Sequence, residues 1–244
     1  MTFRESVTAL RQAQKSSSGA PAYSRFVNRP LGRVFAAAAH QLRMTPNQVT
    51  SLSALFTFAG ITTIALVDPT PVSSVVVTLL LVIGYALDSA DGQLARLRGG
   101  GSPRGEWLDH MVDAVKMSSI HLAVLICWFR FFDLEDGWML APLAFALVST
   151  VFFFGVIMTD LLRRASAAGP REWSGRSQKA RMSPLYALAV LPADYGLLMV
   201  VFLLLWLHTA FLVVYVALLV VNALILIASW VRWYRSLPEG AANA

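Results

Sequence analysis

Long apolar stretches separated by short polar breaks dominate this chain of 244 residues. These stretches cover residues 49–67, 72–97, 105–132, 138–158 and 185–230. A bilayer core of about 30 Å needs roughly 20 apolar residues in a helix that rises 1.5 Å per residue. The last stretch is long enough for two crossings, with a turn near His208. The pattern therefore predicts six transmembrane helices.

Residues 25–44 follow another pattern, in which basic residues alternate with apolar ones at offsets of three and four. The apolar positions are Leu31, Val34, Phe35, Ala38 and Leu42. On a helix they share one face, which predicts an amphipathic helix lying in the membrane interface. We therefore expect an N-terminal tail (1–24), an interfacial helix (25–44), an all-α domain of six transmembrane helices (45–236) and a C-terminal tail (237–244).

The composition supports a membrane protein and its orientation. The chain is 57% hydrophobic and 14% charged, with a mean hydropathy of +0.60, whereas soluble domains carry about 25% charged residues. In the six-helix arrangement, 18 of the 20 basic residues fall on one side. The opposite side receives acidic residues at Asp68 and Asp133, with Arg130 near its edge. The positive-inside rule then predicts an integral protein of the inner (plasma) membrane with both termini in the cytoplasm. We assign the net charge of +6 to contacts with membrane lipid headgroups and not to nucleic acid.

Four carboxylates lie where the second and third predicted spans approach the cytoplasm. They are Asp88, Asp91, Asp109 and Asp113. Spacings of three and four residues put each pair on one face of its helix, and a short connection puts the two pairs at a similar depth. Ionised carboxylates near lipid are costly and usually functional. Their mutual repulsion predicts bound cations, and oxygen-only ligands favour Mg²⁺, Mn²⁺ or Ca²⁺.

Small residues and one arginine accompany the acids: Gly92, Ala95, Arg96 and Gly105. A single glycine would indicate only close packing of membrane helices. Glycines interleaved with four acids indicate a substrate cleft instead. Cations held in such a cleft beside Arg96 would neutralise a diphosphate and orient its cleavage.

All eight fixed positions of one known signature occur within 26 residues, as Asp88-x₂-Asp91-Gly92-x₂-Ala95-Arg96-x₈-Gly105-x₃-Asp109-x₃-Asp113. The pattern resembles the CDP-alcohol phosphotransferase (CDP-alcohol phosphatidyltransferase) family. Six spans after an amphipathic helix are also similar to that family. The start of the first span, Pro46-Asn47-x₂-Thr50, resembles the family segment that borders the cytidine.

The resemblance implies a metal-dependent transferase of phospholipid biosynthesis. It would transfer a substituted phosphate from a CDP-alcohol to an alcohol acceptor and release CMP. The four signature acids would hold two divalent cations, Mg²⁺ or Mn²⁺, and Asp113 would also be the general base. The nucleotide pocket would be lined by Asn47, Thr50, Gly92, Ala95, Arg96 and Gly105. We expect CDP-diacylglycerol as the donor, a polar alcohol as the acceptor and a homodimer as the assembly.

The candidate residues for binding the acceptor each have more than one interpretation. Lys116, three residues beyond Asp113, has two equal interpretations: it binds an acceptor phosphate or it balances the carboxylates. Arg163 is interpreted as part of a helix end at the interface, with an acceptor-phosphate clamp as the alternative. Asp194 is a functional candidate if it lies inside the fifth span. Pro192 makes a later start of that span the alternative, which would leave Asp194 near the surface.

The identity of the substrates stays open at this point. The pair Asp109-His110 resembles CDP-choline or CDP-ethanolamine phosphotransferases, which act on a lipid alcohol. The loop over residues 98–101 instead resembles bacterial enzymes of the phosphatidylinositol phosphate type. A rival from another class is a transporter of a small cation or metabolite. Transporters place such acids near the bilayer midplane, whereas these acids lie toward one face.

Overall fold

The computed structural model describes residues 3–12, 21–167 and 194–237, and all regular structure in these ranges is helical. The helices are α1 (Phe3–Gln12), the π-helical turn η1 (Ser24–Asn28), α2 (Arg29–Gln41), α3 (Pro46–Leu66), α4 (Pro71–Leu97), α5 (Pro103–Phe131), η2 (Asp136–Met139), α6 (Leu140–Ala167), α8 (Tyr195–Val201), η4 (Phe202–Leu204) and α9 (His208–Ser236). The predicted all-α fold class is confirmed.

Five helices in the described ranges are long and apolar enough to cross a membrane. They are α3, α4, α5, α6 together with η2, and α9. The predicted turn near His208 is confirmed, because α9 begins at that residue. The described part of the predicted fifth crossing is the short apolar helix Tyr195–Leu204. Its earlier part, including Pro192, lies outside the described residues, so the count of six stays a prediction.

The three helices that build the site begin in the same way, with a hydroxyl residue followed by proline. The pairs are Thr45-Pro46, Thr70-Pro71 and Ser102-Pro103. In each pair the hydroxyl oxygen accepts a hydrogen bond from the backbone N–H three residues later, at 3.2, 3.1 and 3.1 Å. The bond satisfies a donor that the first helical turn leaves unpaired, and proline has no N–H to lose there. These caps define where α3, α4 and α5 start.

A short glycine loop joins α4 to α5. Gly99 and Gly100 have φ angles of +96° and +131°, which residues with a Cβ rarely adopt. The chain therefore reverses within residues 98–102. This reversal places the end of α4 and the start of α5 on the same side of the bundle, as the similar depth of the acids requires.

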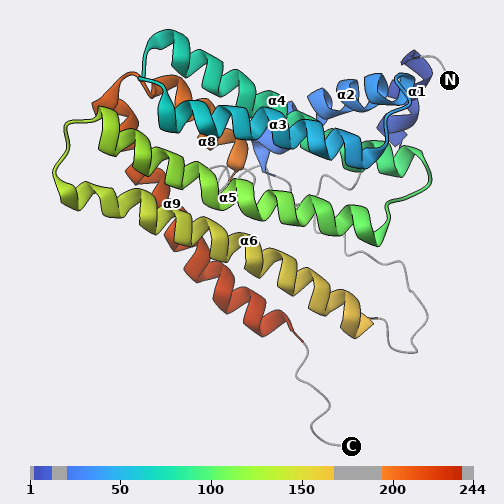
Figure 1. The fold of residues 1–244 in the computed structure, drawn as a ribbon. Coiled ribbons are helices and arrows are strands. Elements are labelled where there is room, and N and C mark those ends of the chain that lie inside the picture. Colours follow the sequence, from blue (N-terminus) through green and yellow to red (C-terminus); the bar gives the residue numbers. More distant parts are fainter. Residues whose placement is uncertain (1–2, 13–20, 168–193, 238–244) are drawn as a thin grey trace, which may run out of the picture.

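Helix α5 lies between two helix pairs, α3 with α4 on one side and α6 with α9 on the other (Figure 1). The α3–α4 contact is close at Gly84, where an added Cβ would lie 2.2 Å from Thr57 Oγ1. Helix α2 packs on α4 at Gly32, where a Cβ would lie 2.8 Å from Ser89 Oγ. Because Gly32 and Gly84 have no side chain, α2, α3 and α4 can approach one another around the part of α4 that carries the acids.

The N-terminal region contains two helices. Within predicted segment 25–44, α2 forms over Arg29–Gln41 and leaves Leu31 and Val34 exposed, while its alanines pack on α4. Its placement in the membrane interface stays a prediction. The predicted tail (1–24) contains α1, which the sequence analysis did not expect; buried Leu10 helps to pack it on α2.

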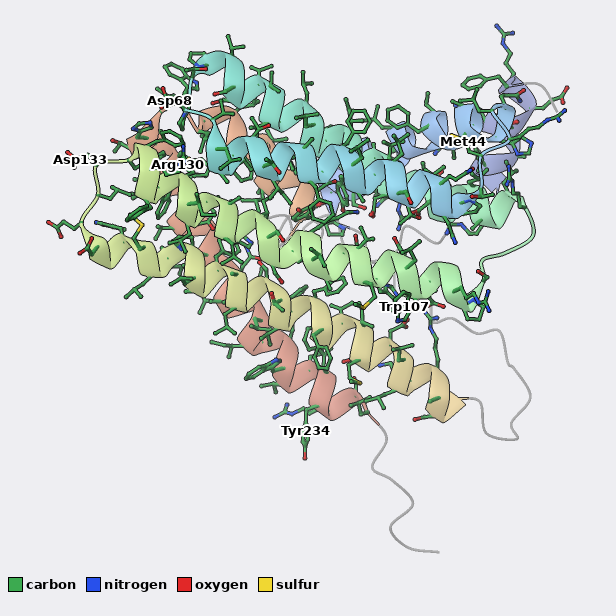
Figure 2. The ribbon with its side chains drawn as sticks, in the orientation of Figure 1. Met44, Asp68, Trp107, Arg130, Asp133 and Tyr234 are labelled. Carbon is green, nitrogen blue, oxygen red and sulfur yellow. The ribbon has the colours of Figure 1, made fainter. Side chains whose placement is uncertain are left out.

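Residues that the charge pattern assigns to one side of the membrane lie at one end of the bundle. Figure 2 shows Asp68, Arg130 and Asp133 together at one end, and Met44, before the first span, at the opposite end. The loops assigned to the acidic side therefore share one side of the bundle. Which side faces the cytoplasm stays a prediction.

Candidate active site

Three of the four signature acids meet between α4 and α5. Asp88, Asp109 and Asp113 each offer a carboxylate oxygen, and these oxygens all lie within 4.8 Å of one another. Six oxygens around Mg²⁺ at about 2.1 Å are roughly 3.0–4.2 Å apart, so a small movement would let one ion touch all three. The hard oxygen donors also suit Mg²⁺ or Mn²⁺ better than zinc. The residues present therefore fit a divalent cation.

Asp91 lies one turn beyond Asp88 and faces α3. It is buried, at 5% exposure, and accepts a hydrogen bond of 2.5 Å from Thr50 Oγ1. The backbone N–H of Gly92 also donates to this carboxylate. Thr50 is thus held against Asp91, and the predicted ligand role of Asp91 stays a prediction.

Lys116 points into the acid cluster. Its Nζ donates to Asp88 Oδ1 at 2.6 Å, to Asp113 Oδ1 at 3.1 Å and to Ser53 Oγ at 3.1 Å. The Lys116 side chain is only 4% exposed. Of the two interpretations of Lys116, the contacts support the balancing of carboxylate charge.

A pocket of about 190 Å³ opens beside the acids. The described residues that line it are Arg29, Asp88, Ser89, Asp91, Gly92, Gln93, Arg96 and Asp109. One wall is therefore anionic, and two guanidinium groups provide positive charge. Sequence reasoning missed Arg29, Ser89 and Gln93. Ser89 and Gln93 lie between signature residues on α4, a position that could have indicated them.

Gln93 connects the α2 and α4 sides of this pocket. Its Nε2 donates to the backbone oxygen of Arg29 at 3.2 Å and to Ser89 Oγ at 3.1 Å. Arg29 lies 59 positions before Asp88 and outside the signature. Only the packing of α2 on α4 brings it to the pocket.

The predicted nucleotide-binding residues occupy different places. Gly92 and Arg96 line the pocket. An added Cβ at Gly92 would have only Arg96 Nη1 within 4 Å among the described residues, at 3.5 Å. At Gly105 a Cβ would lie 3.1 Å from Asn47 Oδ1, so these two residues form a contact between α5 and α3. Ala95 is buried on α4.

Arg163 and Asp194 lie apart from this constellation. Arg163 Nη2 donates to Ser236 Oγ at 2.5 Å and joins the ends of α6 and α9. Asp194 is 3% exposed, and its carboxylate accepts backbone N–H bonds from Ser24 at 2.9 Å and Gly196 at 3.0 Å. These contacts cap α8 and tie it to η1. The basic residues Arg171, Arg176, Lys179 and Arg181 lie outside the described residues.

Comparison with known proteins identifies the family of the chain. The family model for CDP-alcohol phosphatidyltransferase matches residues 43–231. The chain belongs to this family. The matched range contains the four acids and Lys116, whereas Arg29 lies before it. Together with the apolar helices, membership makes the chain an integral membrane transferase and favours the enzyme over the transporter alternative. No curated protein matches the chain.

Three of the solved structures that match are of phosphatidylinositol phosphate synthase of Mycobacterium tuberculosis. The form with CDP-diacylglycerol bound is 20% identical, with a TM-score of 0.56, and the match covers 89% of this chain and 98% of that one. The complex with manganese and citrate is 21% identical, with a TM-score of 0.56 and coverages of 89% and 93%. The apo form is 23% identical, with a TM-score of 0.54 and coverages of 86% and 98%. This likeness shows a shared fold.

Proposed function

We propose that this chain transfers a phosphatidyl group from CDP-diacylglycerol to a polar alcohol and releases CMP, in phospholipid biosynthesis. The observation that carries the proposal is the cluster of Asp88, Asp109 and Asp113 at a pocket that also holds two arginines. The similar synthase has been solved with CDP-diacylglycerol and with manganese. Those complexes support the proposed donor and the proposed kind of metal.

The arginine side of the pocket suits the diphosphate of the donor. Arg29 and Arg96 offer planar donor groups that pair well with phosphate oxygens. Gly92 leaves space beside Arg96, so a phosphate can approach the α4 backbone. Pockets that enclose a whole ligand measure about 300–1,000 Å³. The smaller volume here fits the diphosphate, with the cytidine and the lipid extending beyond it. We propose that Asn47 and Gly105 support the cytidine side, and that Thr50 acts by positioning Asp91.

The four signature acids would hold the divalent cations. Two cations, Mg²⁺ or Mn²⁺, would neutralise the diphosphate and the departing CMP when bound. The carboxylate oxygens of Asp88, Asp109 and Asp113 lie close enough that a small movement would let one ion touch all three. Asp91 would complete the set from the next turn of α4, with its carboxylate oriented by Thr50.

Asp113 is the proposed general base. It belongs to the acid cluster but is not among the described residues that line the arginine pocket. We propose that the acceptor approaches Asp113 from outside this pocket, because an in-line displacement needs the attacking oxygen opposite the leaving CMP. Asp113 takes the hydroxyl proton, the acceptor oxygen bonds to the phosphorus on the lipid side, and the P–O bond to CMP breaks. Positioning and electrostatics supply most of the catalysis.

We also propose six spans, a cytoplasmic active site with cytoplasmic termini, and a homodimer. Cysteines introduced at Asp68 and at Arg98, in loops at opposite ends of the bundle, test the orientation by labelling from outside the cell. The native Cys127 is buried and gives little background. Labelling at position 98 and not at position 68 would contradict the orientation.

The function is tested with the purified full-length chain, Mn²⁺ or Mg²⁺, CDP-diacylglycerol and a panel of alcohols such as inositol phosphate, glycerol phosphate and serine. We expect acceptor-dependent CMP release that excess chelator abolishes. Asp113→Asn should lower the rate about 10²–10⁴-fold, because general-base catalysis contributes that much. The matched control is Asp160→Asn, which changes an exposed acid near the end of α6. No CMP release with any acceptor, or faster release from CDP-choline or CDP-ethanolamine, would contradict the proposed donor.

A further inference from the structure

Lys116 uses all its hydrogen-bonding capacity inside the acid cluster. A protonated lysine has three N–H donors, and the three partners are Asp88, Asp113 and Ser53. No donor is left for an acceptor phosphate in this arrangement. The site around the ammonium is therefore complete without substrate.

The ammonium is also held firmly from α3. Ser53, which is 0% exposed, accepts from Lys116 and donates its own proton to the Gly84 backbone oxygen at 2.8 Å. Gly84 lies at a close contact between α3 and α4. Three helices thus fix the ammonium: α5 carries it, α3 anchors it, and α4 supplies Asp88.

The lysine and a divalent cation would share two carboxylates, those of Asp88 and Asp113. Asp88 and Asp113 belong to the set whose oxygens gather within 4.8 Å, and Lys116 Nζ already contacts one oxygen of each. The ammonium offsets part of the negative charge of the acids, and a positive charge beside the site weakens the binding of a second cation. The diphosphate of a donor would bring the negative charge that a second cation needs.

From these contacts we infer that the Lys116 ammonium holds one of the two cation positions in the resting enzyme. One divalent cation binds by itself, and the second binds together with the donor as its diphosphate joins the site. The identity of the cation rests on the proposed function. The lysine is then a positioning residue that sets the order of binding.

The test is titration of the full-length protein in nanodiscs with Mn²⁺ alone, followed by electron paramagnetic resonance. We expect one bound Mn²⁺ per wild-type chain. Lys116→Met should bind two, with at least about a tenfold gain in affinity for the second, because a positive charge beside it is gone. Ser53→Ala is the matched control: it removes one partner but keeps the ammonium, so it should still bind one.

A thermal measurement covers the case in which Lys116→Met folds poorly. Without its counter-charge the acids repel, so Mn²⁺ should raise the melting temperature of Lys116→Met more than that of the wild type. Equal stoichiometry in the wild type and Lys116→Met, whether one or two, would overturn the inference, and so would equal Mn²⁺ stabilisation. The binding readout needs no turnover. Normal CMP release together with equal Mn²⁺ stoichiometry in the wild type and Lys116→Met refutes only the role of Lys116. The expected difference in Mn²⁺ stoichiometry without any CMP release refutes only the proposed reaction.

Discussion

Two glycines on α4 offer a direct test of which small residues serve packing and which serve the pocket. A methyl group at Gly84 would lie 2.2 Å from Thr57 Oγ1, 3.0 Å from the Thr57 backbone nitrogen and 3.2 Å from the Ser53 backbone oxygen. A methyl group at Gly92 would meet Arg96 Nη1 at an ordinary 3.5 Å. Gly84→Ala therefore pushes α3 and α4 apart, whereas Gly92→Ala places its methyl group in the pocket.

The expected difference in stability follows from these distances. Both substitutions gain about 1 kcal/mol of helix propensity, so the gain cancels between the two variants. The remaining difference is the overpacking at Gly84, about 1–3 kcal/mol. At about 2–4 °C per kcal/mol for a chain of this size, Gly84→Ala should melt roughly 2–12 °C below Gly92→Ala. Gly92→Ala should lower the rate of CMP release about 100-fold, the loss that a 1 Å displacement of the bound diphosphate can cause.

Both variants are measured in the same detergent, by thermal unfolding and by CMP release with saturating Mn²⁺. The wild type provides the reference for each. If Gly92→Ala melted as low as Gly84→Ala, the glycine of the signature would be a packing residue. A wild-type rate of CMP release from Gly92→Ala would refute the proposed approach of the diphosphate to α4.

Three further predictions concern residues around the site. Thr50→Val should weaken Mn²⁺ binding about 10–100-fold in the same titration, because partners that orient metal ligands contribute that much; unchanged affinity would exclude a positioning role. Arg163→Met should keep the wild-type rate of CMP release, since the side chain donates to Ser236; a large rise in the KM for the acceptor would instead support the clamp. Asp194→Ala should lower the free energy of unfolding by about 1–3 kcal/mol, the cost of buried donors left unpaired, with Mn²⁺ stoichiometry unchanged. Altered stoichiometry would place Asp194 in the metal site.

Several features could be predicted because they depend on neighbours along the chain. Apolar stretches of bilayer length indicated the spans, and the start of α9 lies at the turn expected near His208. The spacing of Asp109 and Asp113, together with the glycine loop, indicated that α4 and α5 bring acids together. The pairs of a hydroxyl residue and proline at the starts of α4 and α5 carried the same kind of local signal.

Other features depend on contacts between segments far apart in the sequence, and no pattern of neighbouring residues indicated them. Helix α1 is short and polar, and its burial of Leu10 depends on α2. Arg29 reaches the pocket only because α2 packs on α4. Asp194 was a candidate for function, yet its partner Ser24 lies 170 positions away and the contact is a helix cap.

Lys116 has one contact that the sequence could predict and two that depend on the tertiary structure. Helical periodicity already placed it beside Asp113, because a separation of three residues puts side chains on one face. Its contacts with Asp88 and Ser53, 28 and 63 positions away, depend on how α3, α4 and α5 cross. Periodicity and bilayer thickness act over one helix, so residue order alone can reveal spans and acid pairs. The partner of a buried charge is chosen by the packing between helices, and only the folded arrangement of three helices assigns it.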